Sequence, residues 1–381
     1  MNLDQGFSFG DLGNRCIFVN QCLRSPADMG SNGSHQIPFL WSGFRVVTHN
    51  TAPTTVRNFD KVKRCFDGFP LRTMHRLDDL DAKIIKELGS PSSPNWNVRE
   101  TYSSIARRIG VDEETVRRRL KRAEELGSLP GWRMMVNPHL IGCEAASLDL
   151  EVGNEENKGR AIVEIMRVDG VIKMLDFRGR GLQVTLYYQN ADALRRKIEL
   201  ISSICGASQP TVWELGFPRA GVRMTRTDWE IVDTMLEDAR KSLGDVSRSV
   251  GVSVRTVERR LTGIAEGRAV YLQGTPNFRM FLGLSCVFLV FCPDQNKKRV
   301  VDKLVLSKVQ RTELANTSSQ QYSTFVMLFD NLSQADDTTS WIQSLDGVNS
   351  VKMGIMKNLI VVQDWLRDEI RNRIAADSPN R

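Results

Sequence analysis

One stretch of this chain occurs twice, and the repeat limits the possible folds more than any other feature. The first copy runs from Ile105 to Leu120 and the second from Val246 to Leu261. In both copies a Gly-Val pair is followed, after three residues, by Thr-Val-x-Arg-Arg-Leu. The pattern predicts a short helix, a tight turn and a second helix, which is a helix-turn-helix.

The turn residues fit this prediction in both copies. Gly110 and Gly251 stand where the first helix must end, and Gly adopts the left-handed C-cap conformation without a clash at Cβ. Asp112 and Ser253 follow two residues later and are good N-caps for the next helix. We therefore expect each turn to be closed at both ends by its own residues.

The second helix of the first copy is predicted to have a buried stripe and a basic face. Val116, Leu120 and Ala123 recur at the spacing of one helix face. Basic residues then point outward or flank the stripe: Arg117, Arg118, Arg119, Lys121 and Arg122. DNA phosphates attract such cations, and Arg pairs bidentately with guanine in the major groove. The alternative is a solvated charged face on an ordinary helical hairpin; two equally spaced copies favour DNA.

We predict contacts to double-stranded DNA from both copies. Thr115, Arg118, Arg119 and Arg122 are expected near base edges or adjacent phosphates, and Tyr102 and Ser103 near phosphates. The full candidate set in the first copy is Tyr102, Ser103, Thr115, Arg117, Arg118, Arg119, Lys121, Arg122 and Arg133. In the second copy it is Arg255, Thr256, Arg259 and Arg260.

The two copies are not equally basic. The second has Thr262 and Gly263 where the first has a Lys-Arg pair, Glu258 replaces the first copy's Arg117, and Gly weakens a helix. We expect the first copy to carry most of the DNA affinity. The second is expected to bind weakly or to serve as a partner surface.

The composition excludes only a few classes of protein. The 381 residues allow two or three domains, and the net charge of +7 weakly favours a polyanionic partner. No apolar run reaches the roughly 18 residues of a membrane span, so no membrane association is expected. The seven Cys form an odd set without a Cys-x-x-Cys pair, which predicts neither disulfides nor a zinc site. We expect a cytoplasmic protein with no cofactor, metal or catalytic residue, and with core positions for Cys143, Cys205, Cys286 and Cys292.

The order of expected elements predicts an α+β chain. Residues 1–73 are interpreted as a disordered extension, with Met74 as an alternative start. Each helix-turn-helix is followed by a strand, interpreted as a β-hairpin wing that lays Arg133 on the DNA backbone, and then by the order βαββαβ, which is ferredoxin-like. The predicted divisions are two winged helix-turn-helix domains (74–138 and 222–280) alternating with two ferredoxin-like βαββαβ domains (139–218 and 281–376, with a C-terminal helix).

The second half thus repeats the first, with Asp228 falling on Asp81 and Gly251 on Gly110. We interpret the chain as a tandem duplication joined at Pro218 to Gly221. Two winged helices in one chain satisfy two half-sites without a separate partner, as an intramolecular pseudo-dimer. Further assembly into a homo-oligomer stays open.

The motifs from Leu77 to about Pro138 resemble the DNA-binding domain of the Lrp/AsnC family of prokaryotic transcription regulators. They are Leu-x-x-Leu-Asp-x-x-Ile-Ile, Ile-Ala-Arg-Arg-Ile-Gly-Val, Thr-Val-x-x-Arg-Leu-Lys-Arg and Gly-Trp-Arg-x-x-Val-Asn-Pro. The resemblance implies a sequence-specific regulator whose βαββαβ domain mediates dimerisation and senses an amino acid or related small-molecule effector. The turn Gly179-Arg180-Gly181 lacks the acidic residue that the family commonly carries there. This difference argues against an amino acid as the effector.

Two other classes remain open. The same pair of folds resembles the sirohaem decarboxylases, whose acid-base chemistry is expected to use His. The four His of this chain stand at positions 35, 49, 75 and 139, and none of them falls in a strand or helix predicted for the βαββαβ segments. A scaffold that has lost DNA binding fits the second copy better than the first.

Overall fold

The computed structural model of the chain describes residues 78–88, 95–207, 210–309, 312–314 and 322–376. All of them fall in one compact unit. The predictions of a disordered extension over 1–73 and of an alternative start at Met74 lie outside the described residues.

The first helix-turn-helix unit consists of three helices and one strand. They are α2 (Asp79–Leu88), α3 (Tyr102–Ile109), α4 (Glu113–Glu125) and β1 (Trp132–Val136). Ile84, Leu88, Ile105 and Val116 are fully buried between the three helices. Their spacing explains why each helix turns one apolar face to a shared core.

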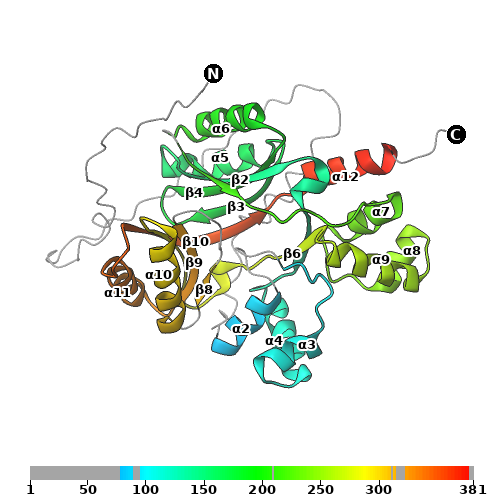
Figure 1. Ribbon diagram of the computed structural model, residues 1–381, viewed down its shortest axis with the longest axis horizontal. Coiled ribbons are helices and arrows are strands. Elements are labelled where there is room, and N and C mark those ends of the chain that lie inside the picture. The colour runs from blue at the N-terminus through cyan, green and yellow to red at the C-terminus, as the bar shows by residue number, and fades with distance from the viewer. Residues whose placement is uncertain (1–77, 89–94, 208–209, 310–311, 315–321, 377–381) are drawn as a thin grey trace, which may run out of the picture. The chain divides into compact units, whose positions relative to one another are not determined.

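The second unit has the same elements in the same order (Figure 1). They are α7 (Arg226–Met235), α8 (Leu243–Val250), α9 (Val254–Glu266) and β6 (Val270–Gly274). Gly263 lies inside α9, which is 13 residues long, the same length as α4. The expectation that Gly263 weakens this helix is therefore not reflected in its length, because Leu261 and Ile264 anchor its last turns in the core.

The two units are joined by a two-stranded antiparallel ribbon of β1 and β6. Trp132 pairs with Gly274, Val136 with Val270, and the central pair is Met134 with Leu272. The predicted β-hairpin wing is therefore wrong, because the partner of β1 comes from the other unit. The buried side chain of Asn137 fixes this junction by donating to the carbonyl oxygens of Pro218 at 2.9 Å and Arg268 at 2.8 Å.

Each unit is followed by a βαββαβ segment. The first contains β2 (Glu144–Glu151), α5 (Lys158–Ile165), β3 (Val171–Phe177), β4 (Gly181–Tyr188), α6 (Ala191–Cys205) and β5 (Thr211–Leu215). The second contains β7 (Leu284–Phe291), α10 (Gln295–Lys308), β8 (Thr312–Leu314), β9 (Tyr322–Phe329), α11 (Leu332–Gln343) and β10 (Ser350–Val361). Short 3-10 helices lie at η1 (Pro138–Ile141), η2 (Glu155–Asn157) and η3 (Phe278–Met280). The predicted order βαββαβ is present in both segments.

The two segments share one eight-stranded sheet with the order β5-β2-β4-β3-β10-β7-β9-β8. If the four strands of each half are numbered in chain order, they lie side by side in the sheet in the order fourth, first, third, second. The halves meet where β3 pairs antiparallel with β10. At this seam Asn358 donates to Asp176 at 2.9 Å, and Asp176 also pairs with the buried Lys158 at 2.7 Å. This continuity between the halves was not predicted.

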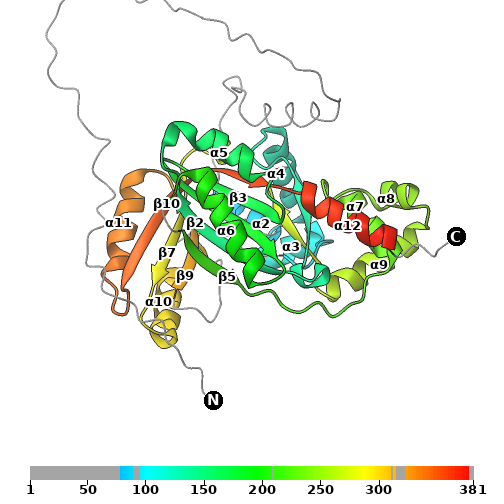
Figure 2. The same cartoon turned by 90° about the horizontal axis from the view of Figure 1, so that it is seen from above.

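In the described part of the chain, the α-helices of each half lie on one face of its strands. Figure 2 looks onto α5 and α6 where they lie over strands of the first half, and α10 and α11 cover the second in the same way. The helix-free faces of the two halves meet through Leu175, Val287 and Met356. Trp213 of β5 also contacts Tyr322 of β9, with ring centroids 4.3 Å apart. The sheet is therefore folded so that its two uncovered faces share a core.

The C-terminal helix α12 (Asp364–Ala376) packs against α7. Leu366 and Ile370 are fully buried in the core that α12 shares with α7. The strand β10 extends to Val361, and the helix begins at Asp364.

The four described cysteines are free and buried, as predicted. Burial raises the pKa of the Cys143 and Cys205 thiols to about 11, which makes them unreactive core residues. None of the described helices is both long and apolar enough to cross a membrane.

Candidate nucleic-acid interface

The turn between α3 and α4 is fixed by its own residues. Gly110 has a φ of 76°, in the left-handed region. The Asp112 carboxylate accepts hydrogen bonds from the hydroxyl and the backbone N–H of Thr115, both at 2.7 Å. These bonds hold the pKa of Asp112 below its ordinary value. The predicted C-cap and N-cap are both confirmed.

The second copy closes its turn in the same way. Gly251 has a φ of 76°, and the Ser253 hydroxyl accepts the backbone N–H of Thr256 at 3.1 Å. The two caps differ in one respect, because Asp112 is ionisable in the pH range of carboxylates and Ser253 is not. Both turns hold the second helix against the first, so that one face of each second helix is exposed.

On α4 the buried stripe is the predicted one. Val116 and Ala123 are buried, and Leu120 is partly buried against the same core. The exposed side chains of the helix include Arg117, Arg118, Lys121 and Arg122. The structure therefore confirms an exposed basic face, but not every predicted member belongs to it.

Arg119 is a correction to the predicted face. Its guanidinium pairs with Asp81 at 3.1 Å and with Asp78, both from the start of the first helix. The side chain is only 26% exposed, and the hydrogen bond to Asp78 raises its pKa. Arg119 fixes α4 to α2 because it lies on the flank of the buried stripe, where Asp81 is within reach.

Arg260 is the matching correction in the second copy. It pairs with Asp228 at 3.2 Å and donates to the Thr225 hydroxyl at 2.9 Å. The Asp228 side chain is only 6% exposed, much like that of Asp81 in the first copy. The sequence carried a signal for this bond, because both its acid and its Arg recur at equivalent places in the two copies.

The remaining basic residues of α4 differ in how far they are neutralised. Arg117 pairs with Glu113 at 2.5 Å and Glu114 at 3.4 Å. Lys121 pairs weakly with Glu125 at 3.8 Å. Within the described part of the chain, neither Arg118 nor Arg122 forms an ion pair. These two are the cations of α4 best placed to meet a phosphate or a base edge.

The helix α3 adds one exposed cation that the candidate set omitted. Arg107 lies in its last turn, is exposed, and has no ion-pair partner among the described residues. Its neighbour Arg108 is occupied instead by Glu87 at 2.6 Å and Glu100 at 3.1 Å. The two adjacent Arg therefore have different roles, which a helical wheel does not reveal.

Tyr102 and Ser103 start α3, as predicted, but only Ser103 is exposed, whereas Tyr102 is half-buried. The Tyr102 ring lies under two guanidinium groups, with Arg240 at 5.0 Å and Arg117 at 5.7 Å from its centroid. Arg240 comes from the second unit and also donates to the Glu100 carbonyl oxygen at 2.7 Å. Tyr102 therefore belongs to a contact between the two units.

Arg133 does not occupy a wing. It lies on β1 within the ribbon, and its guanidinium donates to the carbonyl oxygen of Glu237. The predicted contact of Arg133 with the DNA backbone depended on the hairpin, which is absent, so that prediction loses its basis.

The second copy exposes fewer cations around its turn. Arg255 and Arg259 are exposed on α9, and Thr256 is half-buried beside the cap. Five basic and four acidic residues stand in α4, against three and two in α9, so the net charges of the second helices match. The difference arises in the first helices, because α3 has Arg107 and Arg108 without an acid whereas Arg248 of α8 pairs with Asp245.

Comparison with known proteins identifies the first unit. Residues 77–124 match the model of the AsnC-type helix-turn-helix domain. The HTH-type transcriptional regulator Ptr1 of Methanocaldococcus jannaschii is 36% identical over 72 residues, which are 19% of this chain and 45% of that protein. An uncharacterised HTH-type transcriptional regulator of Pyrococcus furiosus is 35% identical over 88 residues, 23% of this chain and 55% of that protein.

The regulator LrpA of Pyrococcus horikoshii is 35% identical over 66 residues, 17% of this chain and 43% of that protein. The chain thus spans about half the length of the curated relatives it matches.

Likeness to solved structures is more distant. The sirohaem decarboxylase NirDL is 12% identical with a TM-score of 0.47, over 78% of this chain and 99% of that one. Escherichia coli AsnC is 19% identical with a TM-score of 0.27, over 39% of this chain and 99% of that one. These scores lie below the level at which a shared fold can be argued. The sequence matches confirm the resemblance read from the motifs for residues 77–124, which match the AsnC-type helix-turn-helix domain.

Proposed function

We propose that the chain is a sequence-specific DNA-binding transcription regulator that inserts α4 into the major groove. The observation that carries this proposal is the way α4 is held. Its buried stripe and the Arg119–Asp81 pair leave Arg118 and Arg122 exposed on one face, and Arg107 is exposed on α3. The names of the relatives as HTH-type transcriptional regulators point in the same direction.

We further propose that the chain is a tandem duplication of one regulator unit, spanning 74–218 and 222–376. The identical order of elements supports this, and so does the ribbon register. Met134 pairs with Leu272, which holds the equivalent position in β6, and pairing on either side is reciprocal. A symmetric dimer would pair its two copies in this self-complementary way. The two units then act as an intramolecular pseudo-dimer on two half-sites.

A DNA-binding role places the protein in the cytoplasm with the genome and includes no catalytic step. An effector of the amino-acid class, and assembly of several chains into a homo-oligomer, are compatible with the family but are not needed for the DNA contact itself. The sheet edges at β5 and β8 are the ends of the strand order and are the surfaces on which such assembly would be sought.

The proposal is tested by selecting bound sequences from random double-stranded DNA with the purified full chain. Affinities for the best site and for scrambled DNA are then measured at several salt concentrations. We expect a preference of about a thousandfold or more for the selected site. The double variant Arg118→Ala/Arg122→Ala should lose specific affinity by about 1–3 kcal/mol for each base contact removed.

The matched control is Arg195→Ala/Arg196→Ala, which removes the same charge from two exposed residues of α6. It should leave the affinity nearly unchanged. Equal affinity for selected and scrambled DNA, or equal losses in both double variants, would contradict the proposal. Protein without DNA affinity but with haem-like visible absorbance would point instead to the tetrapyrrole enzymes.

A further inference from the structure

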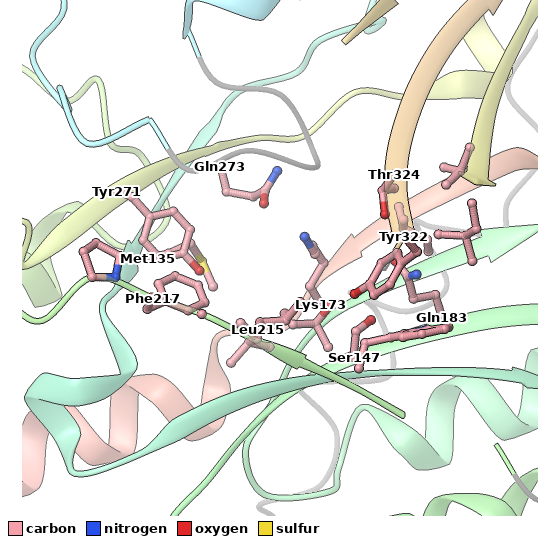
Figure 3. A pocket seen from close by; sticks show the side chains of 18 of the residues that line it. Met135, Ser147, Lys173, Gln183, Leu215, Phe217, Tyr271, Gln273, Tyr322 and Thr324 are labelled. Carbon is pink, nitrogen blue, oxygen red and sulfur yellow. The ribbon is translucent and has the colours of Figure 1, made fainter. Parts of the chain in front are cut away.

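The ribbon of β1 and β6 has a cavity on one side and a loop of the second unit along the outer edge of β1. Three ribbon residues border this cavity of about 250 Å³ (Figure 3): Met135, Tyr271 and Gln273. At the outer edge, the backbone N–H of Met134 donates to the Leu236 carbonyl oxygen at 3.1 Å, and Ala239 donates to Trp132 at 3.0 Å. The loop between α7 and α8 (residues 236–242) is therefore bound to a strand of the first unit.

This loop carries Arg240 to the start of α3. The Arg240 guanidinium donates to the Glu100 carbonyl oxygen at 2.7 Å and lies 5.0 Å from the centroid of the Tyr102 ring. Arg117 of α4 lies 5.7 Å from the same centroid. A cation of the second unit is thus placed beside the N-terminal half of the first unit's second helix.

Arg240 has no carboxylate partner among the described residues. Its side chain is half-buried, and the bond to Glu100 uses only one of the five N–H donors of a guanidinium. Its other donor atoms are not among the buried groups that lack a partner, so they are open to solvent. Arg117, by contrast, is paired with Glu113 and Glu114. Arg240 is therefore the cation at the Tyr102 ring that is most available to an anion.

The start of α3 adds to the positive character of this place. The helix has no acidic residue in its first turn, and Ser103 is exposed there. The N-terminus of a helix favours negative charge. In a helix-turn-helix the helix before the recognition helix crosses the DNA backbone. A duplex that contacts α4 therefore brings its phosphates close to this end of α3.

The equivalent place in the second unit has the opposite character. Three positions differ: Tyr102, Ser104 and Arg117 of the first unit correspond to Leu243, Asp245 and Glu258 of the second. The second unit thus lacks the aromatic ring, has an acid in the first turn of α8, and has an acid in place of a cation on α9.

Arg99 is the equivalent of Arg240 and crosses between the units in the other direction. It donates to the Lys241 carbonyl oxygen at 3.2 Å. Burial and the charge of Arg240 lower the pKa of Arg99, whereas the acids Glu258 and Asp238 of the second unit oppose this shift. Arg99 is therefore already under the influence of two carboxylates.

From these observations we propose that Arg240 of the second unit binds a DNA phosphate beside α4, with its guanidinium held on the Tyr102 ring. The inference rests on the proposed function, because it requires a duplex on α4. It gives the second unit a part in the first unit's DNA contact, whether or not α9 reads bases itself. A phosphate contact is independent of base sequence, so it strengthens binding to any duplex.

The test measures the affinity of the full chain for the selected site and for scrambled DNA at several salt concentrations. Arg240→Gln keeps an N–H donor for the Glu100 carbonyl oxygen but removes the charge, whereas Arg240→Lys keeps the charge. One phosphate contact contributes about 0.9 to the slope of log affinity against log salt. We expect Arg240→Gln to lower this slope by about 0.9 and to weaken binding to both DNAs by about fivefold at 0.15 M salt. Arg240→Lys should retain most of both.

The matched control is Arg99→Gln, the same change at the equivalent position, which also has a hydrogen bond across the units. It should leave the salt slope unchanged, and thermal unfolding of both Gln variants checks that they are folded. A second variant tests the ring. Tyr102→Leu introduces the residue found in the second unit, and its loss of affinity should not add to that of Arg240→Gln, because the ring acts through Arg240.

An unchanged salt slope in Arg240→Gln, with or without a loss of affinity, would make Arg240 only a link between the units and overturn the inference. An equal fall of the slope in Arg99→Gln would do the same. A wild-type chain that binds both DNAs equally, with a slope that depends on Arg240, would contradict the sequence-specific regulator and support the phosphate contact. A chain that binds no DNA would overturn both.

Discussion

The two helix-turn-helix units share one frame and differ in what surrounds it. In both, an Arg of the second helix is bound to a buried Asp of the first helix. After β10 the chain forms α12, which covers α7, whereas the equivalent stretch after β5, residues 216–225, is extended and leads to the next unit. The first unit exposes more positive charge, and the second is packed more deeply. The two units therefore have the same helix arrangement but differ in exposed positive charge and in packing.

The largest expected effect comes from removing the packing of α12. Leu366→Ala deletes a fully buried side chain and should lower the free energy of unfolding by about 2–5 kcal/mol. Hydrogen exchange should rise in α7 to α9 more than in α2 to α4, because α12 contacts α7. The exposed Asn372→Ala on the same helix is the control. Equal exchange in both units would show that α12 supports the whole protein and not one unit.

The shared Arg–Asp pair is expected to contribute to stability in both units. Arg119→Ala and Arg260→Ala should each cost about 1–3 kcal/mol in urea unfolding, because a cation that faces a buried carboxylate is lost while solvent screens part of the effect. Arg118→Ala, next to Arg119 but exposed, should change stability by less than about 0.5 kcal/mol. Stable Arg119→Ala protein that had lost DNA binding would restore Arg119 to the recognition face.

The inequality of the two faces can be measured on DNA. Arg118→Ala should weaken binding to the selected site by about 1–3 kcal/mol, and its second-unit equivalent Arg259→Ala by less than about 1 kcal/mol. The reason is that Arg107 of α3 is exposed and forms no ion pair among the described residues, whereas its equivalent Arg248 of α8 is paired with Asp245. Gel-shift titrations of both variants on one site provide the comparison. Equal losses would mean that both units read DNA with the same strength.

The smallest expected effect concerns the two N-caps. Hydrogen bonds from Thr115 lower the pKa of Asp112, so this cap stabilises the fold above the ordinary carboxylate pKa and loses its effect as the pH falls through the lowered value. The midpoint temperature of thermal unfolding should therefore fall more steeply in the wild type than in Asp112→Asn as the pH is lowered from about 5 to about 3. Ser253→Asn, the same change at the non-titrating cap, should leave the slope as it is.

Local features of this fold could be predicted from the sequence, whereas long-range pairings could not. Gly110, Asp112 and the stripe around Val116 act within a few residues of one another, and each was placed correctly. The pairing of β1 with β6 joins residues far apart in the chain, and apolar alternation does not specify the partner of a strand. Arg119 was wrongly predicted to contact DNA because a helical wheel places it at the boundary between the buried stripe and the exposed face of α4. The direction of its side chain there depends on the ion pair with Asp81.

The ribbon of β1 and β6 has a consequence for how such a protein changes over generations. In a homodimer every substitution occurs in both subunits, so the two recognition helices stay identical. Here the strands that hold the helices together belong to one chain, so a mutation in α4 leaves α9 untouched. The two helices are free to drift towards different base sequences while the ribbon keeps them together at any dilution. Under the proposed function, an operator for this protein need not be a palindrome.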